Sequence, residues 1–180
     1  VINAGTVTVS ALSRISADAQ GYTSAGLGTR GNGPCGGARG YGSGGGGGGH
    51  GGRGGDGADG AGGGTCDSQY QPVGLGSGGG CGDEGTPTGH GGGAINLTVG
   101  SVLTLDGTVT ANGGNGTAHD CGGGAGGSIY ARTAVLNGSG RFTANGGNGT
   151  PYAGAGGGGR IAVYYGAESF TGFDTSTVSA

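Results

Sequence analysis

The stretch GTVTANGGNGT at residues 107–117 decides the fold, because it returns as GRFTANGGNGT at residues 140–150, 33 positions later. A weaker copy, RISAD, occupies residues 14–18. A second recurring block reads GAINL from Gly93, GSIYA from Gly127 and GRIAV from Gly159. Repetition at a fixed period of this size is typical of proteins built from stacked structural units.

Apolar and β-branched residues alternate around these blocks, most clearly at Ile95, Leu97 and Val99. Alternation of period two predicts strands with one buried face, and no segment has a helical period. We therefore expect an all-β repeat fold, either a β-solenoid or a flattened β-sandwich, without significant α-helix. The single repeat-built domain of residues 1–180 divides into a strand cluster (1–17), a long Gly-rich excursion (18–93), two repeat units (94–127 and 128–159) and a terminal strand cluster (160–180).

The composition excludes several classes of protein. Glycine supplies 58 of the 180 residues, whereas Val, Ile, Leu and Phe together supply 25, too few for a conventional core of packed helices or a doubly wound sheet. No apolar run is long enough to span a membrane. The net charge of −3, with no lysine, argues against nucleic acid as a partner. Because Met is absent and both ends fall inside repeat units, we expect a segment of a longer array.

The long excursion holds 35 of the glycines and follows a three-residue rhythm between positions 42 and 65. Three residues per turn is the period of the polyproline II helix, which polyglycine also adopts. We expect residues 42–65 to form such a helix and to pack through backbone hydrogen bonds; the alternative is a flexible glycine linker. One edge of the helix would carry the larger side chains, His50, Arg53, Asp56 and Asp59.

Four cysteines, Cys35, Cys66, Cys81 and Cys121, all lie in Gly-rich excursions. Secreted folds that lack a large core use disulfides as covalent ties, so we expect two disulfides. Of the three possible pairings, we favour Cys35–Cys66, which closes the triplet segment into a loop, and Cys81–Cys121, which joins two adjacent excursions. Metal binding is the alternative, but the chain has no C-x-x-C pair and no paired histidines, so we expect no metal or other cofactor.

Sequons for N-linked glycans begin at Asn96, Asn115, Asn137 and Asn148. In a eukaryotic extracellular protein they would accept glycans; the plainer interpretation is that Asn-Gly pairs supply left-handed turn positions between strands. The stretch GGRGGD at residues 51–56 matches a calcium-binding signature that ends at Asp56. That signature works in tandem copies and occurs here once, so we do not expect calcium there.

The segment GGGAGGSIYARTAVLNGSGRFTANGGNG, residues 122–149, is followed by GGGGRIAVYY at residues 156–165. These stretches resemble the Gly-rich repeats of very large secreted surface proteins. Such repeats occur in bacterial surface proteins, in flagellar-hair (mastigoneme) proteins and in the sexually induced proteins of diatoms. The resemblance covers residues 91–166, implies an extracellular structural role and transfers no catalytic residue.

We therefore predict a non-enzymatic structural subunit or segment of an extracellular filament, flagellar hair or surface layer. Open sheet edges would join copies of the chain head to tail, and glycans would coat the assembly. The alternative is an adhesin-like module that binds ice or a glycan through a flat Gly/Thr-rich face, with Thr108, Thr110 and Thr143 as candidates. A lyase of the β-helix type, using Asp106 or Glu168, would need converging carboxylates and basic residues, which the sequence does not indicate.

Overall fold

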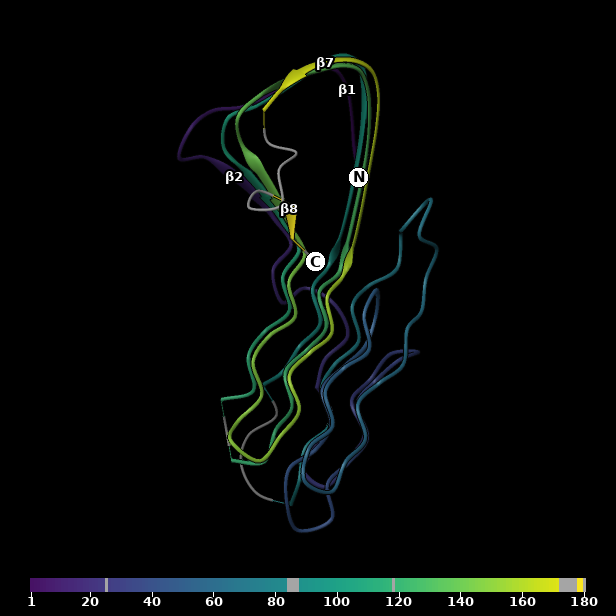
Figure 1. The fold of residues 1–180 in the computed structure, drawn as a ribbon, viewed down its shortest axis with the longest axis vertical. Coiled ribbons are helices and arrows are strands. Elements are labelled where there is room, and N and C mark those ends of the chain that lie inside the picture. Colours follow the sequence, from purple (N-terminus) through teal and green to yellow (C-terminus); the bar gives the residue numbers. More distant parts are fainter. Residues whose placement is uncertain (25, 84–87, 118, 172–177, 180) are drawn as a thin grey trace.

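The computed structural model describes residues 1–24, 26–83, 88–117, 119–171 and 178–179. These residues contain no helix, and their strands form two parallel sheets, which confirms the all-β expectation. The sheets occupy one end of the molecule, and the Gly-rich segments occupy the other end along its longest axis (Figure 1). Chain segments therefore pass repeatedly from the sheets into the Gly-rich part and back.

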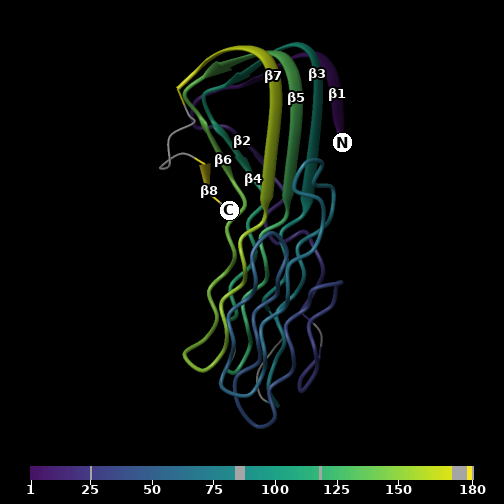
Figure 2. The same cartoon turned by 45° about the vertical axis from the view of Figure 1, so that its right-hand side comes forward.

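Each sheet has four strands, and the chain alternates between the two sheets (Figure 2). The first sheet has the order β1-β3-β5-β7. Its strands are β1 (Ile2–Val9), β3 (Ala94–Leu105), β5 (Ser128–Gly138) and β7 (Arg160–Phe170). The second sheet has the order β2-β4-β6-β8. Its shorter strands are β2 (Arg14–Ser16), β4 (Thr108–Thr110), β6 (Arg141–Thr143) and β8 (Val178–Ser179).

Equivalent residues of the sequence repeat lie side by side in both sheets. Ile95 pairs with Ile129, which pairs with Ile161 on the next strand. In the second sheet Val109 pairs with Phe142. Each passage of the chain therefore adds one parallel strand to each sheet, at a spacing of about 4.8 Å.

The apolar core lies between the two sheets and takes residues from both. Its largest fully buried aliphatic and aromatic side chains are Leu97, Leu103, Leu105, Val109, Ile129, Leu136 and Phe142. Phe142 of β6 and Phe170 at the end of β7 contact each other with ring centroids 6.0 Å apart. Burying a side chain of this size contributes about 1.5–3 kcal/mol, so this narrow core stabilises the sheet end of the molecule.

The strand edges at the two ends of the stack are open. Among the described residues, the outer edges of β1 and β7 have no strand partner, and the same holds for β2 and β8. An outer strand presents a row of N–H and C=O groups to which a further strand can pair. The two sheets therefore end in four edges that can accept additional strands.

The Gly-rich segments form a hydrogen-bonded bundle, named here the glycine bundle. In its central stretch, residues 44–50, successive N–H groups donate to different neighbours, and every third residue donates to the same neighbour. The donor–acceptor pairs are Gly45–Asp120, Gly48–Gly123, Gly46–Ala38, Gly49–Cys35 and Gly47–Gly55. This three-residue rhythm is the one expected of chains with three residues per turn.

The stretch 122–127 repeats the pattern with three other neighbours. Its donor–acceptor pairs are Gly122–Gly80, Ala125–Ser77, Gly123–Gly154, Gly126–Gly157, Gly124–Gly114 and Gly127–Ala111. The backbones lie so close that a Cβ on Gly46 would collide with the carbonyl oxygen of Ala61. The bundle is therefore held by backbone hydrogen bonds in place of an apolar core.

Residues 42–65 do not form one helix, which corrects the sequence-based prediction. The chain folds back on itself, because Gly47 donates to Gly55 and Gly54 donates to Gly63. A hydrogen bond from Gly57 to Gly60 closes the second reversal. A continuous polyproline II helix of this length would extend about 70 Å, whereas shorter stretches can satisfy their backbone groups against neighbours on every side.

Candidate functional site

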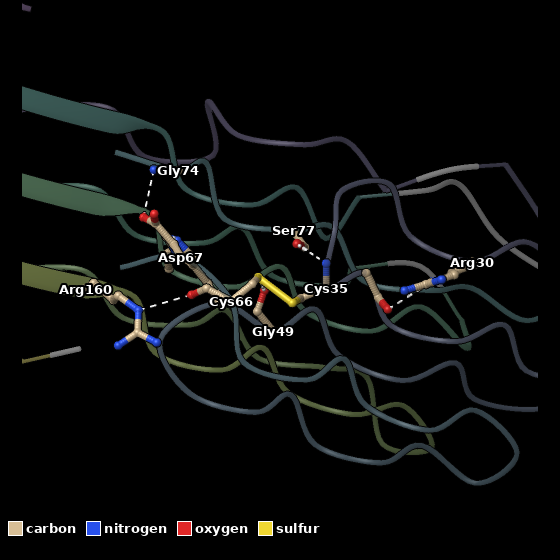
Figure 3. The surroundings of a disulfide bond; sticks show 11 residues. Arg30, Cys35, Gly49, Cys66, Asp67, Gly74, Ser77 and Arg160 are labelled. Atoms are coloured by element: carbon tan, nitrogen blue, oxygen red, sulfur yellow. Dashed lines mark hydrogen bonds and ion pairs between the residues drawn. A yellow bond between two sulfur atoms is a disulfide. The ribbon is translucent and has the colours of Figure 1, made fainter. Parts of the chain in front are cut away.

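The glycine bundle is joined to the first sheet at a corner built around Cys66, which Figure 3 shows. Cys66 forms a disulfide with Cys35, and the Cys66 carbonyl accepts a hydrogen bond from Arg160 Nε at 3.1 Å. Arg160 is the first residue of β7. The backbone N–H of Cys35 donates to Ser77 Oγ at 3.1 Å. The disulfide is thus tied on one side to the sheet and on the other to the bundle.

Asp67, the next residue, has a left-handed backbone conformation with φ of 71°, which Asp tolerates better than most residues. Its Oδ2 accepts the backbone N–H groups of Gly74 at 2.8 Å and Val73 at 3.0 Å. The hydroxyl of Ser128, the first residue of β5, lies 3.1 Å from the same oxygen. Burial works against ionisation, but hydrogen bonds from Gly74, Ser68, Ser128 and His50 lower the pKa of Asp67 overall. The corner therefore holds a carboxylate.

His50 lies behind Asp67 with a side chain that is 1% exposed. Its Nδ1 is 2.8 Å from the carbonyl oxygen of Gly126, and its Nε2 is 3.3 Å from Asp67 Oδ2. Each ring nitrogen of His50 therefore faces an oxygen, one from the backbone and one from a carboxylate. His50 therefore connects the central stretch of the bundle to the stretch 122–127 and to the corner.

A hollow of about 230 Å³ opens at this corner, lined by His50, Cys66, Asp67 and neighbouring residues. Among the described residues, no group of three or more His, Cys, Asp or Glu side chains is arranged to hold a metal ion. The acidic and imidazole groups that line the hollow already bind each other. These groups therefore form hydrogen bonds that hold the glycine bundle against the first sheet.

The second disulfide joins Cys81 to Cys121 inside the bundle. Both side chains are fully buried, and the two residues also form an isolated antiparallel bridge. Asp120, immediately before Cys121, again has a left-handed backbone, with φ of 67°. The two pairings are those that the sequence analysis favoured. Each disulfide connects stretches of the glycine bundle.

The predicted polar edge is only partly as expected. Arg53, Asp56 and Asp59 are exposed, but His50 is buried, because the chain reverses just after it. Asp56 accepts the backbone N–H of Gly62 at 2.8 Å and pairs with Arg53 at 2.5 Å. These two contacts lower the pKa of Asp56, chiefly through the Gly62 hydrogen bond. Asp56 thus closes a local loop.

The repeated asparagines form a ladder along the bundle, which corrects their assignment as turn residues. The backbone N–H of Asn145 donates to Asn112 Oδ1, and that of Asn148 donates to Asn115 Oδ1, each at 2.8 Å. Asp18 occupies the same position in the first repeat and accepts the N–H of Asn112 at 2.7 Å. The glycines of the Asn-Gly pairs at 112–116 and 145–149 lack positive φ, so these pairs do not supply left-handed turn positions.

The turn interpretation holds at one sequon. Asn137 precedes Gly138, whose φ of 110° forms the bend between β5 and β6. A Cβ on Gly138 would collide with the backbone of Leu105, so glycine is required there. The four sequon asparagines differ in accessibility: Asn115 and Asn148 are exposed, and Asn96 and Asn137 are half-buried.

The threonines proposed for a flat binding face lie on β4 and β6, where Thr110 pairs with Thr143. Thr110 is 8% exposed, and its hydroxyl donates to Asp18 Oδ2 at 3.0 Å. Thr108 and Thr143 are half-buried, and Thr108 lies beside Arg141 rather than beside another threonine.

Sequence reasoning overlooked the corner residues Asp67, Ser128 and Arg160. Their only sequence signals are that Asp67 follows a cysteine and that the other two begin strands. These three residues meet because the chain comes back to the first sheet at residues 66–75. No local pattern in the sequence indicates that contact.

The protein is therefore an all-β repeat protein in which two parallel sheets are joined to a glycine bundle, and two disulfides cross-link the bundle. Comparisons with protein-family models, with curated proteins and with solved structures found no match. Within the described ranges, no helix is long and apolar enough to cross a membrane.

Proposed function

We propose that this chain is a non-catalytic structural segment of an extracellular filament, flagellar hair or surface layer. In this proposal, copies of the chain join head to tail by continuing both sheets. The observation that supports it is that each sheet has two open edges and that equivalent residues of successive repeats pair with each other across the strands. A further strand added in that register would meet the same side chains that neighbouring strands already meet.

The proposed architecture is a β-solenoid in which each repeat contributes one rung. Parallel pairing of equivalent residues supports it, as does the return of each even-numbered strand to the second sheet. In stacked repeat proteins each unit contacts its neighbours, and terminal units need a partner or a cap. A head-to-tail contact between rungs generates a helical or linear array when it does not close on itself.

The covalent features fit an exterior material. Disulfides persist in oxidising compartments, and both disulfides here lie in the part of the molecule that has no apolar core. We propose N-linked glycans on the accessible sequons, with Asn115 and Asn148 as the preferred acceptors because they are exposed. Mass spectrometry of the native protein, with and without enzymatic deglycosylation, tests this assignment.

A charge-swap experiment tests the head-to-tail contact. Thr8 of β1 and Ser169 of β7 occupy the same register position, through Thr104 and Asn137 on the intervening strands. In the proposed contact, Ser169 of one copy would therefore lie beside Thr8 of the next. Lysines at both positions would place like charges directly opposite and weaken assembly, whereas Thr8→Lys with Ser169→Glu would restore it.

Sedimentation and electron microscopy of the four proteins give the readout. We expect extended assemblies from the wild type and from the Lys/Glu pair, and monomers from the Lys/Lys pair. The control carries Ala58→Lys and Ala61→Lys on exposed bundle positions and should assemble like the wild type. A wild type that stays monomeric at high concentration, or equal behaviour of the Lys/Lys and Lys/Glu pairs, contradicts the proposal.

A further inference from the structure

A second hollow, of about 440 Å³, lies on the first sheet, where β3, β5 and β7 run side by side. It is lined by Thr98, Val99, Arg132, Thr133, Tyr164 and Tyr165. Thr98 pairs with Arg132, and Arg132 pairs with Tyr164, so these three side chains form a row across the sheet. Ligand pockets typically enclose roughly 300–1,000 Å³, so the hollow is large enough for a small ligand.

Arg132 gives the hollow a positive charge. Its side chain is exposed, and among the described residues no carboxylate pairs with it. By contrast, Arg39 and Arg53 are each paired with an aspartate. A guanidinium presents several donors in a fixed plane that matches a carboxylate, so an unpaired arginine in a hollow favours an anionic ligand.

The described residues that line the hollow include no acidic side chain. Glu168, further along β7, accepts a hydrogen bond from the Tyr165 hydroxyl, which raises the pKa of Tyr165. The Glu168 carboxylate keeps its negative charge in this contact, but Glu168 is not among the residues that line the hollow. Arg132 is the charged side chain of the lining.

Tyr164 supplies a fixed aromatic surface beside this charge. Its hydroxyl donates to the Tyr70 carbonyl at 2.7 Å, and its ring packs edge-on against buried Tyr130, with ring centroids 5.8 Å apart. The residue is nevertheless 45% exposed. Fixing a side chain before binding reduces the entropy lost on association. An exposed tyrosine with a fixed ring is suited to contact the C–H face of a sugar.

We propose that this hollow binds an acidic saccharide, with its carboxylate on Arg132 and a sugar ring against Tyr164. The charge selects the acid, and the aromatic ring selects the pyranose. Tyr164 and Tyr165 lie on β7, whose outer edge has no strand partner among the described residues, so the hollow borders the proposed contact between copies of the chain. The site gives a surface layer or filament a means of contacting an acidic polysaccharide.

Calorimetric titration with trigalacturonate tests the proposal, with the fully methyl-esterified trisaccharide as the neutral comparison. We expect the acid to bind and the ester to bind at least tenfold more weakly. Arg132→Gln should weaken acid binding by about tenfold or more, the size expected for loss of a charge-assisted hydrogen bond. Tyr164→Ala should weaken binding of the acid by a similar factor.

The control is Arg14→Gln, which removes an exposed arginine of the second sheet. Within the part of the chain that the structure describes, Arg14 also has no carboxylate partner. This variant should bind the acid like the wild type, and circular dichroism should show all variants folded. The proposal is overturned if the wild type does not bind trigalacturonate at millimolar concentration. It is also overturned if acid and ester bind equally, if Arg14→Gln weakens binding as much as Arg132→Gln, or if Tyr164→Ala binds like the wild type.

Discussion

At the residue scale, the tolerance of a glycine to substitution depends on its place in the bundle. Gly46 is buried, and a Cβ there would collide with the backbone of Ala61. Gly64 is exposed, and a Cβ there would have no atom within 4 Å. We expect Gly46→Ala to lower the unfolding free energy by roughly 1–3 kcal/mol, because backbone stretches must separate.

Gly64→Ala is the matched control. Alanine at a position with free space and a compatible backbone stabilises a protein by about 0.4–1 kcal/mol, because it restricts the unfolded chain. Chemical unfolding followed by circular dichroism measures both variants. Equal effects of the two substitutions would mean that the close approach of backbones around Gly46 does not limit stability.

The lowered pKa of Asp67 predicts that the stability of the protein depends on pH. Folding lowers this pKa, so Asp67 stabilises the folded state fully above the unfolded pKa of about 3.9. That contribution is lost as the pH falls through the lower folded pKa. We expect Asp67→Asn to be less stable at neutral pH and to lose less stability on acidification than the wild type. Urea unfolding between pH 7 and pH 2 measures both slopes.

Asp59→Asn serves as the control for this measurement, because Asp59 is exposed on the bundle surface. Its acid-dependent loss of stability should follow that of the wild type. If Asp67→Asn also follows the wild type, the hydrogen bonds at the corner do not contribute to acid sensitivity.

At the element scale, the asparagine ladder links successive repeats. Asn112→Ala removes the side-chain oxygen that accepts the Asn145 N–H. We expect Asn112→Ala to reduce the unfolding free energy by about 0.5–1.5 kcal/mol and to speed hydrogen exchange at Asn145. Asn112→Asp should rescue both effects, since Asp18 performs the same role for Asn112 in the first repeat. A rescue variant that exchanges as fast as Asn112→Ala argues against the ladder.

The strands were predictable because their residues carry the signal locally. Ile95, Leu97 and Val99 alternate in sequence, and all three are buried in β3. The Asn-Gly pairs were misassigned because the same dipeptide suits two environments. At Asn137 it forms a turn, whereas at Asn112 the side-chain oxygen accepts a backbone N–H from the neighbouring repeat and the following glycine lacks positive φ.

At the scale of the whole molecule, the sequence indicated the three-residue rhythm but not its packing. Polyglycine has no side chains that choose one neighbour over another, so the reversal after His50 depends on which stretches surround it. The corner at Cys66 was hidden for the same reason: Asp67 and Ser128 are 61 positions apart and meet only because the excursion returns to the sheet.

The division into an apolar sheet end and a glycine bundle predicts unequal effects of reduction. Both disulfides lie in the bundle, with sequence separations of 31 and 40 residues, whereas the apolar core lies between the sheets. We expect replacement of Cys81 and Cys121 by alanine to lower the unfolding free energy by about 2–4 kcal/mol. Native-state hydrogen exchange should accelerate at amides 122–127 much more than in β3 and β5. Equal acceleration at both ends would mean that bundle and sheets unfold as one cooperative unit, and that backbone hydrogen bonding couples them as strongly as a shared core.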